Sequence, residues 1–206
     1  MSEAGRTGDP VAASLPHTAE TVPVVNLANA LTVFRILLVP VFVVVLFVDD
    51  GNNDWWRTAA FVIFAVAAIT DQIDGRIARA WNLVTDFGKL ADPIADKALI
   101  GAALISLSVL GVVPWWMTVV ILVREIGVTL LRFWVVRHGV IAASQGGKLK
   151  TMLQSIAIGL YVLPAFGALH TVAEVIMYAA IAVTLATGLD YVWRALRLRR
   201  GAGASA

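Results

Sequence analysis

Long apolar runs, separated by short polar breaks, are the feature that most limits how this chain can fold. Runs of this kind are typical of helices that cross a lipid bilayer. The sequence therefore predicts an all-α integral membrane protein with six transmembrane helices. They are expected at residues 26–48, 55–80, 93–110, 115–136, 152–163 and 170–196.

Composition supports the membrane assignment and excludes several kinds of function. The chain has 206 residues, 59% of them hydrophobic, well above the share of about half that is usual in globular proteins. With 16 Lys+Arg against 14 Asp+Glu, the net charge of +2 is too small to indicate nucleic-acid binding. There is no cysteine, which excludes disulfides, thiolate nucleophiles and cysteine-bound metals.

The same pattern divides the chain into a membrane domain and two tails. Residues 1–26 are rich in Gly, Pro, Ser and Ala and predict a disordered tail, residues 27–199 form the six-helix domain, and residues 200–206 form a second tail. Basic residues gather in three places on one side: the turn after 71, the loop at 137–150 and the C-terminal end. By the positive-inside rule, both termini are expected in the cytoplasm.

A stretch rich in aspartate lies where the second and third runs meet. Asp71, Asp74, Gly75 and Ala78 would share one face of a helix, and Gly88, Asp92 and Asp96 repeat at steps of four. The Asp92–Pro93 pair suggests that the third helix begins there, with Asp92 as its cap. Four carboxylates at a bilayer edge are costly and predict a site for Mg²⁺ or Mn²⁺, with Ca²⁺ as a competitor. Arg76, Arg79 and Lys89 nearby would suit phosphoryl chemistry.

The spacing D-x-x-D-G-x-x-A-R-x8-G-x3-D-x3-D is present without a gap, and on it the chain resembles the CDP-alcohol phosphotransferase family. The resemblance implies a cytosol-facing polar cavity, a homodimer, and two metal ions at the pyrophosphate of a CDP-lipid. The implied metal ligands are Asp71, Asp74, Asp92 and Asp96, with Asp96 also the catalytic base. The implied CDP-lipid contacts are Thr32, Gly75, Ala78, Arg79 and Gly88.

Three further stretches, N-A-L-T-V-F-R, V-R-E-I-G-V-T-L-L-R and G-K-L-K-T, look like the branch of that family that uses glycerol 3-phosphate as acceptor. One departure is Ala28, where the family often has proline. The branch implies transfer of a phosphatidyl group from CDP-diacylglycerol to glycerol 3-phosphate, in phospholipid biosynthesis at the cell (inner) membrane. The implied acceptor phosphate site comprises Arg124, Arg132, Ser144, Lys148 and Lys150.

Other interpretations of the same residues stay open. The aspartates could form intrahelical ion pairs with neighbouring Arg and Lys residues, including Lys97, and Arg124 and Glu125 could neutralise each other against another helix. The acceptor could be inositol phosphate or phosphatidylglycerol. A protein of another class, a cation transporter, would also place carboxylates in a membrane.

Overall fold

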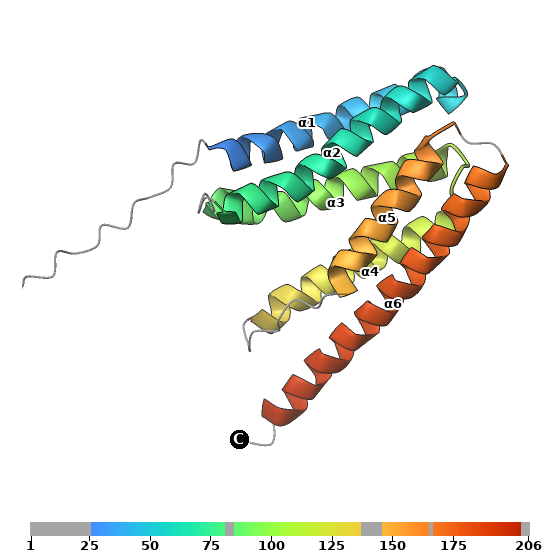
Figure 1. The fold of residues 1–206 in the computed structure, drawn as a ribbon. Helices are drawn as coiled ribbons and strands as arrows, with labels where there is room; N and C mark the ends of the chain where they lie inside the picture. The colour runs from blue at the N-terminus through green and yellow to red at the C-terminus, as the bar shows by residue number, and fades with distance from the viewer. Residues whose placement is uncertain (1–25, 81–84, 137–145, 165–166, 203–206) are drawn as a thin grey trace, which may run out of the picture.

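The computed structural model describes residues 26–80, 85–136, 146–164 and 167–202, and within them the fold is all-α (Figure 1). The six helices that the sequence predicts are present in this part of the chain. Their bounds are α1 Leu27–Phe47, α2 Asp54–Ala80, α3 Asp86–Val109, α4 Trp115–Val136, α5 Gly146–Val162 and α6 Ala168–Ala202, with a short 3-10 helix, η1 Val48–Gly51, between α1 and α2.

The helices form two groups that pack side by side. α1 lies against α2 and α3, while α6 lies against α4 and α5, and the groups meet where α2 and α3 contact α5 and where α3 contacts α4. Because each connection reverses direction, the ends of α2 and α4 and the beginnings of α3 and α5 lie toward the same end of the bundle as the C-terminus (Figure 1). This end carries the aspartate-rich stretch.

Aromatic and aliphatic side chains form a core within and between the two groups. Phe42 of α1 and Phe64 of α2 are almost completely buried, with ring centroids 5.8 Å apart. Gly159 allows α5 to approach α2 closely, because a Cβ atom there would lie only 3.3 Å from the Phe61 ring. At the far end of α2, Arg57 Nε donates to the Val162 carbonyl over 3.0 Å, so it ties α2 to the last turn of α5.

The turn between α1 and α2 is tight because three consecutive residues adopt left-handed backbone angles. Asp49, Asp50 and Gly51 have φ values of 58°, 51° and 71°. Gly51 also lies against the α3–α4 connection, where a Cβ atom would be 2.9 Å from Leu110 Cδ1. At the other end of α1, the cap is Asn26, whose side chain accepts a hydrogen bond from the Asn29 amide at 2.9 Å.

Some helix bounds differ from those predicted. The third helix begins at Asp86, so the prediction that Asp92 caps a helix starting at Pro93 is wrong, and Pro93 lies inside α3. Asp86 suits the positive end of a helix dipole, and the single hydrogen bond that Pro93 omits does not stop the helix. α5 begins at Gly146, which places Lys148 and Lys150 on a helix instead of a loop. α6 continues to Ala202, so the first residues of the predicted tail at 200–206 are helical.

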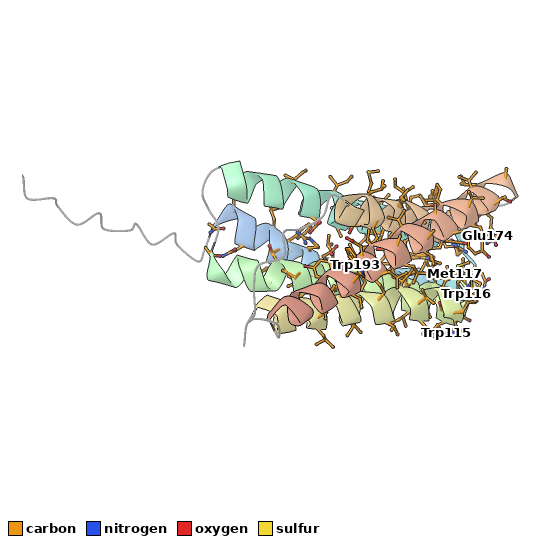
Figure 2. All side chains as sticks on the ribbon, turned by 90° about the horizontal axis from the view of Figure 1, so that it is seen from below. Trp115, Trp116, Met117, Glu174 and Trp193 are labelled. Atoms are coloured by element: carbon orange, nitrogen blue, oxygen red, sulfur yellow. The ribbon has the colours of Figure 1, made fainter. Side chains whose placement is uncertain are left out.

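Two segments in the described part of the chain are long and apolar enough to cross a bilayer by themselves, Asn29–Gly51 and Ala168–Trp193. Tryptophan has the amphipathic character of an interfacial residue. Trp115 and Trp116 lie at the end of the bundle that also holds Glu174, whereas Trp193 lies away from that end (Figure 2). Trp116 stacks on Tyr178 with ring centroids 6.0 Å apart.

Candidate active site

The four aspartates of the predicted metal site lie on two neighbouring helices. Asp71 and Asp74 belong to the last turns of α2, and Asp92 and Asp96 belong to the first half of α3. The structure describes the side chains of Asp71 and Asp96, which are both partly exposed and close enough to repel each other electrostatically. The side chains of Asp74 and Asp92 lie outside the described set, and within that set no three acidic or histidine side chains form a metal site.

Asp71 is held by an arginine from a different helix. The Arg35 guanidinium, on α1, is completely buried and forms an ion pair with Asp71 Oδ1, while the Asp71 side chain is 33% exposed. The contact crosses between helices, so it differs from the intrahelical pairing that the sequence left open as an alternative. A buried arginine requires a partner of opposite charge, and Asp71 supplies one.

The predicted contacts of the CDP-lipid are only partly described. Thr32 is on α1 and is almost completely buried, at 1% exposure. Gly75, Ala78 and Arg79 lie on α2 and Gly88 on α3, at the same end of the bundle as the aspartates, and the structure does not describe their side-chain surroundings.

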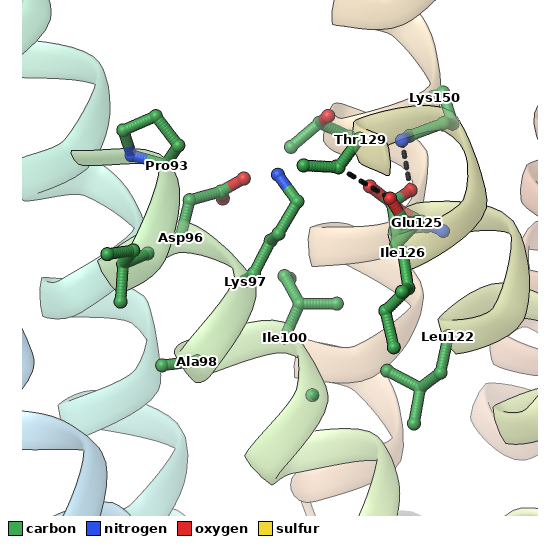
Figure 3. A pocket seen from close by; sticks show the side chains of 14 residues that line it. Pro93, Asp96, Lys97, Ala98, Ile100, Leu122, Glu125, Ile126, Thr129 and Lys150 are labelled. Atoms are coloured by element: carbon green, nitrogen blue, oxygen red, sulfur yellow. Dashed lines mark hydrogen bonds and ion pairs between the residues drawn. The ribbon is translucent and has the colours of Figure 1, made fainter. Parts of the chain in front are cut away.

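A cavity of about 600 Å³ opens beside Asp96, between α3, α4 and α5. Its polar lining comes from facing helices: Asp96 and Lys97 on α3 lie opposite Glu125 on α4 and Lys150 on α5 (Figure 3). Much of the remaining lining is apolar and includes the side chains of Ile94 and Leu122. The cavity therefore combines a few charged side chains, among them the predicted base Asp96, with a largely apolar wall.

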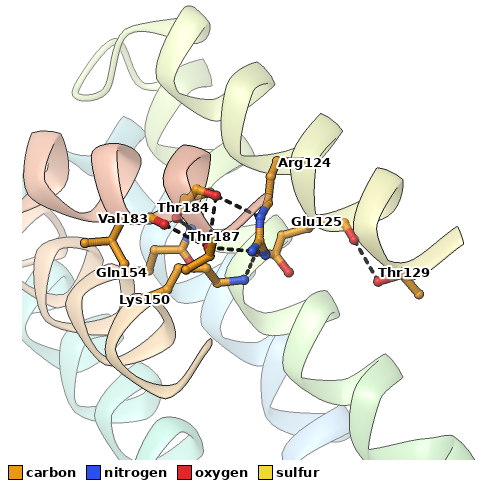
Figure 4. A network of polar contacts seen from close by, with 8 residues as sticks. All are labelled: Arg124, Glu125, Thr129, Lys150, Gln154, Val183, Thr184 and Thr187. Atoms are coloured by element: carbon orange, nitrogen blue, oxygen red, sulfur yellow. Dashed lines mark hydrogen bonds and ion pairs between the residues drawn. The ribbon is translucent and has the colours of Figure 1, made fainter. Parts of the chain in front are cut away.

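Glu125 is the centre of a polar network that joins three helices (Figure 4). Its Oε1 atom accepts hydrogen bonds from Lys150 Nζ and, at 3.2 Å, from Arg124 Nη1. Arg124 is turned toward α6, where it donates to the Thr184 carbonyl at 3.1 Å and to Thr187 Oγ1 at 2.8 Å. Of the two predicted acceptor residues whose side chains are described, Lys150 lines the cavity and Arg124 links α4 to α6.

The other predicted acceptor residues are not described at side-chain level. Arg132 lies in the last turns of α4 and Lys148 in the first turn of α5, and Ser144 falls outside the described residues.

Comparison with known proteins identifies the family. Residues 25–186 match the sequence profile of CDP-alcohol phosphatidyltransferases. The chain belongs to this family. The resemblance seen in the aspartate spacing is therefore confirmed. The spacing lies on α2 and α3, and α3 borders the cavity.

Individual relatives of this CDP-alcohol phosphatidyltransferase carry closely related names. The probable phosphatidylglycerophosphate synthase of Mycobacterium tuberculosis (strain H37Rv) is 58% identical over 174 residues, which cover 84% of this chain and 83% of the relative. The CDP-diacylglycerol–glycerol-3-phosphate 3-phosphatidyltransferase of Bacillus subtilis (strain 168) is 38% identical over 188 residues, covering 84% and 97%. The enzyme of that name from Escherichia coli (strain K12) is 39% identical over 139 residues, covering 65% and 74%.

The donor chemistry fits the divalent metal that membership of the family implies. Asp71 and Asp96 offer carboxylate oxygens, the hard ligands that Mg²⁺ and Mn²⁺ prefer. Mutual repulsion between these carboxylates would fall if a cation lay near them. The residues present therefore suit a divalent cation at this end of α2 and α3.

Several residues of the site were missed by sequence reasoning. Lys97, Glu125, Thr129 and Gln154 all line the cavity, yet none was among the predicted site residues. The signal for Lys97 was its position next to Asp96, and the signal for Glu125 was a charge inside an apolar run. Nothing in the pattern marks Thr129 or Gln154, because their role depends on which helices become neighbours.

Proposed function

We propose that this chain transfers the phosphatidyl group of CDP-diacylglycerol to sn-glycerol 3-phosphate, which gives phosphatidylglycerophosphate and CMP. The observation that carries the proposal is the 58% identity, over 84% of the chain, to a probable phosphatidylglycerophosphate synthase. The relatives named as phosphatidyltransferases for glycerol 3-phosphate support the same acceptor. This is the acceptor that the sequence predicts.

The metal site is proposed to consist of Asp71, Asp74, Asp92 and Asp96, holding Mg²⁺ or Mn²⁺, most simply as two ions. When bound, the metal neutralises the pyrophosphate oxygens of the CDP-lipid and makes the phosphorus easier to attack. The positions of these aspartates on adjacent helices support the proposal. Thr32, Gly75, Ala78, Arg79 and Gly88, all on α1, α2 or α3, are proposed to hold the CDP-lipid.

Asp96 is proposed to act as the general base. Its carboxylate faces the cavity and would accept the proton from the acceptor hydroxyl. The hydroxyl oxygen then forms a bond to the phosphorus that carries diacylglycerol, and the bond from that phosphorus to the CMP oxygen breaks. CMP leaves with the electron pair of the broken bond, so charge and atoms balance.

The phosphate of the acceptor is proposed to bind beside the charged side chains that line the cavity. Lys150 is the best placed of the described candidates, because it lines the cavity and is fixed by Glu125. Arg124 lies beside the same glutamate and is proposed to contribute positive potential while it holds α6. Arg132, Ser144 and Lys148 remain proposed members of this site.

The cellular arrangement is also part of the proposal. Six spans of the cell (inner) membrane, a cytosol-facing cavity and cytoplasmic termini agree with the apolar runs and the charge distribution of the chain. A homodimer is proposed because the resemblance to the family implies one. α6 has 35 residues, so at a rise of about 1.5 Å per residue it is about 50 Å long. This length exceeds the thickness of the hydrocarbon core of a bilayer, which is about 30 Å. Its basic C-terminal part would therefore extend beyond the bilayer.

The test is CMP release by the purified full-length chain in detergent with CDP-diacylglycerol and Mg²⁺. Glycerol 3-phosphate should support release, and inositol phosphate or phosphatidylglycerol should not replace it efficiently. A preference for either of those acceptors would contradict the acceptor assignment. The absence of CMP release with every acceptor would contradict the proposed phosphatidyltransferase activity.

A further inference from the structure

Helix α1 has a buried polar stripe, formed by Asn29, Thr32 and Arg35, with exposures of 5%, 1% and 0%. Polar side chains in an otherwise apolar helix are expected only where they have partners. Asn29 Nδ2 donates to Thr85 Oγ1 at 2.8 Å, just before α3 begins. Arg35 pairs with Asp71 on α2. One helix therefore makes polar contacts to α2 and to the residue that precedes α3, and α2 and α3 carry the four aspartates.

The contact between Arg35 and Asp71 fixes the carboxylate more firmly than a surface ion pair would. The arginine is fully enclosed by packed helices, so its side chain has little freedom to follow a moving partner. Asn29 and Thr85 hold α1 against the beginning of α3. Asp71 is therefore held in place relative to α3, which carries Asp96.

We propose that Arg35 is a positioning residue, which fixes the Asp71 carboxylate and thereby makes the metal site favour Mg²⁺ over Ca²⁺. The inference rests on the proposed metal site. Mg²⁺ requires near-octahedral geometry at 2.0–2.1 Å, whereas Ca²⁺ accepts variable geometry at 2.3–2.6 Å. A ligand that cannot shift suits the first ion better than the second.

Charge and geometry act differently on metal binding at this site. The positive charge of Arg35 opposes the binding of both divalent ions to a similar extent. Removal of Arg35 should raise the affinity for one metal by removing a repulsive charge and lower it by loosening the Asp71 carboxylate. The affinity for one metal therefore does not separate the two effects. The ratio of the Ca²⁺ and Mg²⁺ affinities cancels the charge effect and reports on geometry.

The experiment measures this ratio directly on the metal-free, full-length protein in detergent. Mn²⁺ is bound first, its free concentration is followed by electron paramagnetic resonance, and Mg²⁺ or Ca²⁺ is added as the competitor. Loss of a residue that orients a metal ligand lowers metal affinity by about 10–100-fold. Because this loss should fall mainly on Mg²⁺, Arg35→Met should shift the affinity ratio toward Ca²⁺ by about tenfold. Arg35→Lys keeps the charge but not the planar fork, and should shift the ratio in the same direction by less.

A matched control is available on α2. Like Arg35, Arg57 joins two helices, through hydrogen bonds to the Val162 and Tyr161 carbonyls, and it is partly buried. It lies near the opposite end of α2 from Asp71. Arg57→Met should therefore leave the affinity ratio unchanged. A shift of the same size in Arg57→Met would overturn the proposal, because it would show that any loosening of the bundle has this effect.

The remaining outcomes are equally decisive. An unchanged ratio in Arg35→Met overturns the proposal; if that variant does not fold, an unchanged ratio in Arg35→Lys does so. The Asp71→Asn variant distinguishes failure of the proposed metal site from failure of the proposed role of Arg35. If this variant binds Mn²⁺ as the unmodified protein does, Asp71 is not a ligand and the proposed site fails. If Asp71→Asn weakens Mn²⁺ binding while the Arg35 variants keep the normal ratio, only the role of Arg35 fails.

Discussion

Replacement of Lys150 by methionine tests the acceptor site most directly. Lys150 lines the cavity beside Asp96 and is only 6% exposed. Methionine keeps most of the apolar length of the side chain and removes the ammonium group. Glu125 would still accept a hydrogen bond from Arg124 at 3.2 Å, so no unpaired carboxylate is left and the fold should survive.

The magnitude follows from the loss of one charged hydrogen bond to the acceptor phosphate. Such a bond contributes about 1.5–3 kcal/mol, and 1.4 kcal/mol corresponds to a factor of ten. The value of kcat/KM for glycerol 3-phosphate should therefore fall by about tenfold to a hundredfold in Lys150→Met. The corresponding value for CDP-diacylglycerol, measured at saturating acceptor, should change much less.

The assay is steady-state CMP release, with each substrate varied in turn. Lys150→Arg should recover part of the lost kcat/KM because it restores a cation. Arg124→Met should lower the melting temperature more and the acceptor kcat/KM less than Lys150→Met, since the Arg124 guanidinium binds α6. An unchanged acceptor kcat/KM in Lys150→Met, or an equal fall for both substrates, would refute the reasoning.

Other predictions concern the base, the far end of the bundle and the topology. Asp96→Asn should abolish CMP release while CDP-diacylglycerol binding, measured by equilibrium binding of labelled lipid, largely persists; residual turnover near the normal rate would exclude Asp96 as the base. Arg57→Met should lower the free energy of unfolding by about 1–3 kcal/mol with unchanged KM values, because Val162 loses its hydrogen bond; unchanged thermal denaturation would argue against this contact. Cysteines introduced at Asn53 and Gly146 have no cysteine background. In intact cells, an impermeant thiol reagent should label only the first, and the opposite pattern would reverse the proposed orientation.

The helices could be predicted because their apolar runs are long, whereas the helix bounds at polar ends could not. The Asp92–Pro93 pair has the local form of a helix start, but the α3 helix continues through it from Asp86. Local rules describe what a short segment prefers, and packing against neighbouring helices can outweigh the loss of one hydrogen bond. For the same reason the sequence predicts a loop at Lys150, whereas the structure has this residue on α5.

The ligand candidates were found from spacing, but their partners were not. Asp71 and Asp96 belong to a spacing motif that is typical of the family, and the motif can be recognised from the order of residues alone. The partner of Asp71 is Arg35, which lies 36 positions earlier in the chain and on another helix. The link from Arg124 to Thr187 spans 63 positions. Such contacts depend on which helices become neighbours, and one sequence does not state this.

The buried polar stripe on α1 also bears on how the nascent chain enters the bilayer. Arg35 lies within Asn29–Gly51, one of the two described segments that are long and apolar enough to cross a bilayer. An arginine costs about 2.5–3.5 kcal/mol at the centre of a lone helix in lipid, and Arg35, which lies in the first half of α1, carries a smaller cost of the same kind. The arriving Asp71 on α2 offsets part of this cost, and the tight turn at 49–51 brings the two helices together as soon as both are synthesised. α1 and α2 are therefore expected to leave the translocon as a paired hairpin.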